Sequence, residues 1–377
     1  MIWLLFAVCA VAALYQLIAL AACVRSKIGL PACSRGSLPA VSILKPIRHA
    51  TPDIDHAIRT HLEQAYPEFE LLLGVRESEA GSISAADPRV RVIVCRTEAP
   101  NNKVGTLIDL AREARHPVMI VNDADIAVPT NYMRDVVAEL EPAEVGLVTC
   151  LYRGESTTWP GRFEALGVAT DFAPSALVAP FVGVSEFGLG STLAFRRADL
   201  DRIGGFEAIA EYLADDYQLA CKLHALGRRN VIAKPVVSTT LGPQTWAAAW
   251  RHQVRWSRTV RLSRKGGYIG LPVTFATLWA VIAAACGLPW IALGLILFRF
   301  AMALTAGWLV LRSKDVLKHF YLIPLRDLYT VAVWAAALFG NTVEWGDEIL
   351  TLDRAGRIVA KNSLSAQGPL PYGRGSE

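Results

Sequence analysis

The first 25 residues restrict the fold most, because they hold an apolar run that has to be kept out of water. Residues Ile2 to Val24 are apolar except for Gln16. A helix needs only about 20 such residues to cross the hydrocarbon core of a bilayer. The segment Leu20 to Cys23 resembles the cleavage box of bacterial lipoproteins. A cleaved signal, however, has basic residues before its apolar run, and this chain has none there. We therefore expect an uncleaved anchor over residues 1–25.

Two further apolar stretches lie near the carboxyl end. Residues Gly266 to Leu311 carry one charge, Arg299, which could line a lipid cavity or extend to the membrane surface. They are expected to form a pair of helices. Residues Phe320 to Gly340 are interrupted by Arg326 and Asp327, so they are expected to lie partly in the interface or to re-enter. The sequence thus predicts a membrane region over 266–341 and a polar tail over 342–377, poorly ordered in its last dozen residues.

Charge and cysteine usage restrict the compartment and the partners. Basic residues follow the first apolar run, at Arg25, Lys27 and Arg35, which favours a cytoplasmic location for the domain after it. A second basic run, residues 251–265, is expected to be an interfacial helix at the same membrane surface. The net charge of +4 is too small to suggest nucleic acid. The seven cysteines form no C-x-x-C pair, as expected of unpaired thiols in a reducing compartment.

The central domain, residues 26–250, alternates short apolar runs with amphipathic stretches. This pattern predicts an α/β domain with a mainly parallel sheet. The expected strands are 40–46, 70–75, 90–95, 118–122 and 145–151, and the expected helices are 53–64, 103–115 and 131–140. Ligands bind such sheets beyond the carboxyl ends of the strands. That rule selects the loops at Lys45-Pro46, at Arg76-Glu77 and at residues 122–125.

The turn after the fourth expected strand contains two carboxylates, Asp123 and Asp125. Two carboxylates on one turn can bind Mg²⁺ or Mn²⁺, which prefer oxygen ligands and also bridge diphosphates. A D-x-D triplet is weak evidence by itself, since the same residues are common in solvated turns and helix caps.

Two later motifs could complete a site. Asp215 and Asp216 precede an apolar helical run, so they could cap that helix or supply a general base. His252, Arg255 and Trp256 lie in the basic run. They could bind phosphate and sugar, or anchor an interfacial helix, and both could hold at once.

Taken in order, these motifs resemble those of the ceramide glucosyltransferase family, glycosyltransferase family 21. The resemblance covers roughly residues 1–345. Within the family, the chain is similar above all to a bacterial hopanoid branch that glycosylates bacteriohopanetetrol. It rests on seven segments in order: Leu44–Arg48, Gln64–Glu70, Asp123–Asp125, Gly190–Arg196, Ile203–Phe206, Asp215–Tyr217 and His252–Trp256.

The resemblance implies a GT-A fold, a UDP-sugar donor and inversion at the anomeric carbon. In the family's order, Asp123 matches the second aspartate, which acts with metal and diphosphate, while Asp125 rests on local geometry. Asp216 matches the third, the expected base, with Asp215 beside it. Arg255 and Trp256 match the end of the (Q/R)-x-x-R-W motif.

Further residues are matched on the donor side. The resemblance assigns donor contacts to Lys45, Pro46, Asn101 and Lys103. The first family aspartate, which contacts uracil, falls on Glu77, with Glu79 as the alternative. His252 stands where the family has Gln or Arg, and imidazole can still donate to phosphate.

These assignments predict an inverting, multi-pass glycosyltransferase of a bacterial inner membrane with its catalytic domain in the cytoplasm. The expected reaction transfers N-acetylglucosamine from UDP-GlcNAc to bacteriohopanetetrol, with Mg²⁺ or Mn²⁺ as cofactor. The alternatives are transfer of glucose to ceramide or diacylglycerol, a processive polysaccharide synthase, and a non-catalytic membrane scaffold.

Overall fold

The computed structural model describes residues 2–28, 38–49, 51–81, 83, 87–242 and 245–363. Cys33, Arg35 and the last dozen residues of the expected tail lie outside these ranges. The strands are β1 Val41–Pro46, β2 Phe69–Val75, β3 Val90–Val94, β4 Val118–Val121, β5 Val145–Glu155, β6 Leu193–Arg196, β7 Arg229–Thr240, β8 Thr342–Trp345, β9 Glu348–Leu352 and β10 Ile358–Ser363. The helices are α1 Ile2–Lys27, α2 Pro52–Leu62, α3 Asn102–Glu113, α4 Tyr132–Leu140, α5 Trp159–Gly167, α6 Ala173–Phe181, α7 Arg197–Arg202, α8 Asp215–His224, α9 Trp246–Ser263, α10 Lys265–Gly270, α11 Ala276–Ala285, α12 Pro289–Leu304, α13 Lys314–His319 and α14 Ile323–Ala337.

The central domain is built on a seven-stranded sheet in the order β3-β2-β1-β4-β6-β5-β7. Strands β3, β2, β1 and β4 are parallel, and β6 runs antiparallel to both of its neighbours. Alternate residues of each strand enter opposite cores, so Ile43 packs with α2 and α4 while Leu44 packs with α3 and α8. The expected α/β domain with a mainly parallel sheet is confirmed, and its first four strands end at one edge.

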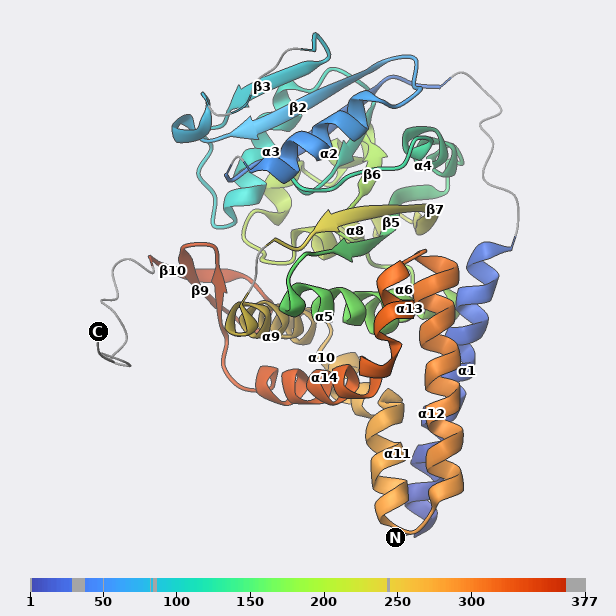
Figure 1. Ribbon diagram of the computed structural model, residues 1–377. Coiled ribbons are helices and arrows are strands. Elements are labelled where there is room, and N and C mark those ends of the chain that lie inside the picture. The colour runs from blue at the N-terminus through green and yellow to red at the C-terminus, as the bar shows by residue number, and fades with distance from the viewer. Residues whose placement is uncertain are drawn as a thin grey trace.

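The membrane-type helices extend away from this sheet as a bundle of α1, α11 and α12 (Figure 1). Within the described part of the chain, two helical segments are long and apolar enough to cross a membrane, Ile2–Lys27 and Pro289–Val310. A bent pair at 265–285 makes a third if it counts as one span. Small side chains such as Ala12, Ala283 and Ala292 let the helices approach closely. The carboxyl-terminal half of α1 packs against α6, which fixes the bundle to the central domain.

Helix α14 lies across the end of the bundle rather than along it (Figure 1). It exposes Leu325 and Leu328 and turns Arg326 and Asp327 inward. Asp327 forms a two-point ion pair with Arg299 of α12, whose guanidinium also donates to the Thr170 carbonyl at 2.6 Å. Arg299 is therefore held by protein groups, and neither a lipid cavity nor the membrane surface is needed to explain it.

Three arginines of α9 have partners within the protein as well. Arg261 donates to the carbonyls of Leu338 and Gly340, and Arg251 pairs with Glu344 at 3.0 Å. Arg258 donates to the Thr342 carbonyl. The expectation of a basic face presented to lipid headgroups does not describe these three arginines, because their guanidinium groups fasten α9 to the segment after α14.

The expected polar tail is folded over its first part. Strands β8, β9 and β10 form a three-stranded antiparallel sheet, called here the C-terminal sheet. Its own small core joins Val343, Leu350, Leu352 and Ile358 to Leu213 of the central domain. The prediction missed this sheet because its strands are short and mostly polar outside those apolar positions.

Candidate active site

The turn after β4 carries the two aspartates on a buried support. Lys45, at the end of β1, is fully buried and its ammonium donates to the backbone carbonyls of Asp123, Ala124 and Ile126 at 3.0, 3.3 and 3.1 Å. Burial lowers the pKa of Lys45 to about 7, against the opposing influence of Asp125 and Asp123. Lys45 was expected to contact the donor, but the structure places its side chain beneath the turn, where it fixes the turn's shape.

A second lysine lies above the turn, between carboxylates of two different elements. Lys103, in the first turn of α3, contacts Asp123 at 2.8 Å and Asp215 at 2.9 Å. Burial alone would lower the pKa of Lys103, but Asp123 and Asp215 outweigh it and raise the value. Lys103 therefore stays charged and draws the turn toward the start of α8.

Asp216 lies next to this ion pair in the first turn of α8, where the helix dipole favours a carboxylate. Its two oxygens accept from the backbone N–H groups of Gly190 at 3.0 Å and Tyr217 at 2.7 Å. Burial, with the neighbouring Asp215 charge, raises the pKa of Asp216 to about 6. Asp215 is buried against Lys103, so Asp216 is the carboxylate better suited to exchange a proton with a substrate.

Gly190 marks the space between the aspartates. A methyl group at this position would lie 3.1 Å from one oxygen of Asp123 and 3.5 Å from one of Asp216. The missing side chain thus keeps both carboxylates open to a common space. The sequence analysis quoted Gly190 within a motif but gave it no role at the site.

Asp125 is held from the opposite side of the turn. One of its oxygens accepts from the Thr239 hydroxyl and from the Thr240 N–H at 3.1 Å. Burial raises the pKa of Asp125, and the nearby Asp123 charge adds to the effect.

The residues present fit a divalent cation that takes most of its ligands from substrate and water. Among the described residues, no three His, Cys, Asp or Glu side chains are grouped to hold a metal by themselves. Asp123 keeps one oxygen beside the space at Gly190, and Asp125 keeps one oxygen free of the threonine contacts. Mg²⁺ is commonly bound in this way, through one or two carboxylates plus phosphate oxygens.

The H-x-x-R-W motif lies on α9 and approaches the same centre. Burial lowers the pKa of Arg255 to about 10, opposed by the Glu164 and Asp123 charges, and its side chain makes no hydrogen bond or ion pair within the described part of the chain. His252 instead contacts Glu164 at 2.7 Å, and its ring lies 4.4 Å from that of Trp256. Among the described residues, Arg255 is thus a half-buried cation that feels the Glu164 and Asp123 charges but forms no ion pair. Glu164, on α5, had no signal in the sequence.

The remaining predicted residues take different places. Asn101 is buried, caps α3 through its side-chain oxygen and donates to the Tyr212 carbonyl at 2.8 Å, so it orders the segment before Lys103. Pro46 ends β1, half-buried. Glu77 is exposed and 4.0 Å from Arg96, whereas Glu79 contacts His49 at 3.4 Å. A uracil contact by Glu77 stays a prediction.

Comparison with known proteins identifies the family. The sequence profile described as glycosyl transferase family 21 matches residues 4–358. The chain belongs to that family. Among family members, ceramide glucosyltransferase 1 of Caenorhabditis elegans is 27% identical over 209 residues, which are 52% of this chain and 44% of that protein. Ceramide glucosyltransferase 3 of the same organism is 24% identical over 216 residues, 52% of this chain and 45% of that protein. The matched regions thus span less than half the length of these curated relatives.

The fold agrees with a solved glycosyltransferase. The mannosyltransferase PcManGT from Pyrobaculum calidifontis, solved with GDP-Man and Mn²⁺, superimposes with a TM-score of 0.52 at 19% identity, over 89% of this chain and 97% of that one. The family 21 protein described here therefore has a GT-A-like fold and is a glycosyltransferase with candidate membrane-spanning helices. The expected fold class and enzyme class are confirmed.

Proposed function

We propose that this glycosyltransferase moves a sugar from a UDP-sugar onto the hydroxyl of a lipid acceptor with inversion at the anomeric carbon. One observation supports this most: within the described residues the half-buried Arg255 makes no hydrogen bond or ion pair, although the charges of Glu164 and Asp123 act on it. A guanidinium so placed is suited to the diphosphate of a nucleotide-sugar.

Asp216 is the proposed general base. It accepts the proton of the acceptor hydroxyl while that oxygen forms a bond to the anomeric carbon and the bond from that carbon to UDP breaks. A pKa of about 6 leaves the carboxylate mostly ionised at neutral pH, yet basic enough to take a proton. Displacement in one step inverts the centre, so no protein nucleophile is needed.

Charge on the departing diphosphate is balanced by residues on several elements. Arg255 approaches from α9 and Lys103 from α3. A divalent cation held by Asp123 and Asp125 would supply further positive charge to the leaving group. Lys45 keeps the turn in place, because its side-chain nitrogen is bonded to three backbone carbonyls of that turn.

A lipid acceptor is supported by exposed apolar side chains on α6 and α14. Phe181 and Val182 are exposed at the end of α6, shortly before the segment that ends at Gly190. The backbone N–H of Gly190 bonds the carboxylate of Asp216. The exposed Leu325 and Leu328 of α14 and the candidate spans provide a membrane-facing side from which an apolar molecule can approach.

The acceptor that we propose is bacteriohopanetetrol, with UDP-GlcNAc as donor, at the cytoplasmic face of a bacterial inner membrane. Support comes from the motif order described above. The second candidate is ceramide with UDP-glucose, because the two curated relatives are named ceramide glucosyltransferases. Either acceptor offers a hydroxyl on an apolar body and requires the same base.

Two variants test the catalytic assignment against a scaffold role. Asp216→Asn keeps the shape of the side chain and removes the base, and Asp123→Ala removes the carboxylate next to Gly190. We expect transfer of labelled sugar to lipid to fall by about 10²–10⁴ for Asp216→Asn, the contribution of a general base. Activity retained in both variants would mean that the aspartates only cap and brace the fold.

A further inference from the structure

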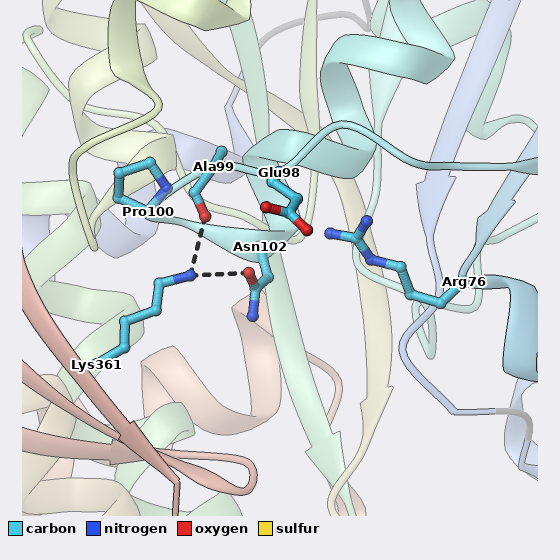
Figure 2. A pocket seen from close by; sticks show the side chains of 6 residues that line it. All are labelled: Arg76, Glu98, Ala99, Pro100, Asn102 and Lys361. Atoms are coloured by element: carbon cyan, nitrogen blue, oxygen red, sulfur yellow. Dashed lines mark hydrogen bonds between the residues drawn. The ribbon is translucent and has the colours of Figure 1, made fainter.

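A cavity of about 520 Å³ is lined in part by Asn102, the residue before Lys103, and has no role in the reaction proposed above. It lies between the end of β2, the segment before α3 and the C-terminal sheet. Six residues line it: Arg76, Glu98, Ala99, Pro100, Asn102 and Lys361 (Figure 2). The volume falls in the range of roughly 300–1,000 Å³ that small-molecule sites occupy.

The C-terminal sheet supplies one wall of this cavity. Lys361 of β10 extends to the segment before α3 and donates to the Ala99 carbonyl at 2.9 Å and to the Asn102 side-chain oxygen at 2.8 Å (Figure 2). The amide of Asn102 in turn donates to Glu348 of β9 at 3.0 Å. An ammonium has three N–H donors, so Lys361 keeps one for a ligand.

The C-terminal sheet and its last turn are also hydrogen-bonded to the segment that precedes Asp215 and Asp216. The Leu213 N–H donates to the Gly356 carbonyl at 3.1 Å, and the Ile358 N–H to the Glu211 carbonyl at 2.7 Å. Residues 211–213 are separated from Asp215 and Asp216 by Ala214 alone. The C-terminal sheet therefore braces both the cavity and the start of α8.

The position of the cavity relative to the aspartates suits the nucleoside half of a donor. Asn102 lines the cavity, and the next residue, Lys103, contacts Asp123 at 2.8 Å. A molecule with its diphosphate at Asp123 and Arg255 can thus place the group on the other side of that diphosphate, the nucleoside, in the cavity.

The side chains in the cavity suit a pyrimidine base. Glu98 and Arg76 point toward one another across the rim (Figure 2). A carboxylate accepts from the N–H of a uracil ring, while a guanidinium and an ammonium donate to the carbonyl oxygens on either side of it. In this arrangement the carboxylate that faces the base is Glu98, since Glu77 does not line the cavity.

We propose that the C-terminal sheet completes the nucleoside subsite of the donor, with Lys361 donating to the base or ribose and Glu98 accepting from the base. This rests on the proposed function, because it takes the diphosphate to lie at Asp123. It gives β8–β10 a role in donor affinity that the family's aspartates do not supply.

Titration calorimetry of the purified full-length protein with UDP, UMP and pyrophosphate tests the subsite. Lys361→Ala and Glu98→Gln should each weaken UDP and UMP about tenfold, the effect of one hydrogen bond to a charged group, and leave pyrophosphate unchanged. Glu98 is exposed, so Glu98→Gln should keep the thermal unfolding temperature. Arg354→Ala is the matched control, because it removes an exposed cation of the same sheet that makes no contact with the cavity.

Two outcomes would overturn the subsite. One is UDP binding by both variants that equals that of the unmodified protein. The other is an equal loss for pyrophosphate, which would place phosphate in the cavity. The unmodified protein reports separately on the proposed function: UDP binding without sugar transfer to any lipid would refute lipid glycosylation and leave the subsite standing.

Discussion

Lys45→Met tests whether Lys45 supports the aspartate turn, because it removes the support and leaves Asp123 and Asp125 unchanged. Methionine keeps the unbranched shape of the buried stem and removes the ammonium that bonds three carbonyls of the turn. Loss of those bonds leaves the carbonyls without their donor, at about 1–3 kcal/mol each before relaxation, and we expect a net loss of about 2–4 kcal/mol in the free energy of unfolding. Activity should fall about 100-fold, since small displacements of catalytic groups have effects of that size.

The pH dependence of this loss identifies the buried amine of Lys45, which is charged in the folded protein below about pH 7 and neutral above it. Burial lowers the pKa of folded Lys45 to about 7, whereas the unfolded lysine keeps its ordinary value of about 10.4. Between these values the unfolded chain binds more protons, so Lys45 makes the free energy of unfolding rise with pH, by at most about 1.4 kcal/mol per unit. Lys45→Met abolishes that rise. Its destabilisation should therefore be larger at pH 9 than at pH 6.5.

Thermal unfolding in detergent micelles at pH 6.5, 8 and 9 measures the effect. Lys318→Met, an exposed lysine on α13, is the control and should leave both the unfolding temperature and its pH dependence unchanged. A destabilisation by Lys45→Met that is the same at all three pH values would refute the account of a buried lysine with a lowered pKa.

Three further predictions follow from the same geometry. Because burial and Asp215 raise the pKa of Asp216 in the free protein to about 6, kcat/KM should be constant above about pH 7 and fall tenfold per unit below pH 6. A kcat/KM independent of pH down to 4.5 contradicts Asp216 as the base. Chelation of divalent cations should abolish transfer, and added Mn²⁺ or Mg²⁺ should restore it; full activity in excess chelator contradicts the metal site at Asp123. Arg299→Met leaves Asp327 as an unpaired buried charge and should lower the free energy of unfolding by about 3–5 kcal/mol. The double variant Arg299→Met with Asp327→Leu should recover most of the unfolding temperature. A double variant no more stable than Arg299→Met contradicts the ion pair.

Local pattern was sufficient to predict β1 to β5 and the position of the aspartate turn, but β6 and β7 of the same sheet were not predicted. An apolar run followed at once by Asp123 predicted β4 and its carboxyl-terminal loop, because the hydrophobic pattern of a strand and the residues of a turn are both local features of the sequence. The motif order then identified the family, which the profile match confirmed.

Side-chain partners distant in sequence could not be predicted in this way. Lys45 was matched to a donor loop, but its side chain points under the aspartate turn. It does so because pairing of β1 with β4 brings it next to the Asp123 carbonyl, 78 residues further along the chain. Arg261 was expected at a lipid surface, but packing of α9 on α14 brings it to carbonyls 77 and 79 residues away. The C-terminal sheet was missed for the same reason, since its apolar positions are too few to predict strands until Leu213 completes their core.

The lipid acceptor is the part of the proposed reaction that transfer assays address most directly. The purified protein is incubated with UDP-GlcNAc or UDP-glucose and with bacteriohopanetetrol, ceramide or diacylglycerol, and the lipid products are read by mass spectrometry. We expect N-acetylglucosaminyl bacteriohopanetetrol from the unmodified protein and a loss of about 10²–10⁴ in Asp216→Asn. Transfer to ceramide alone would refute the hopanoid acceptor, and no transfer to any lipid from either donor would contradict lipid glycosylation itself.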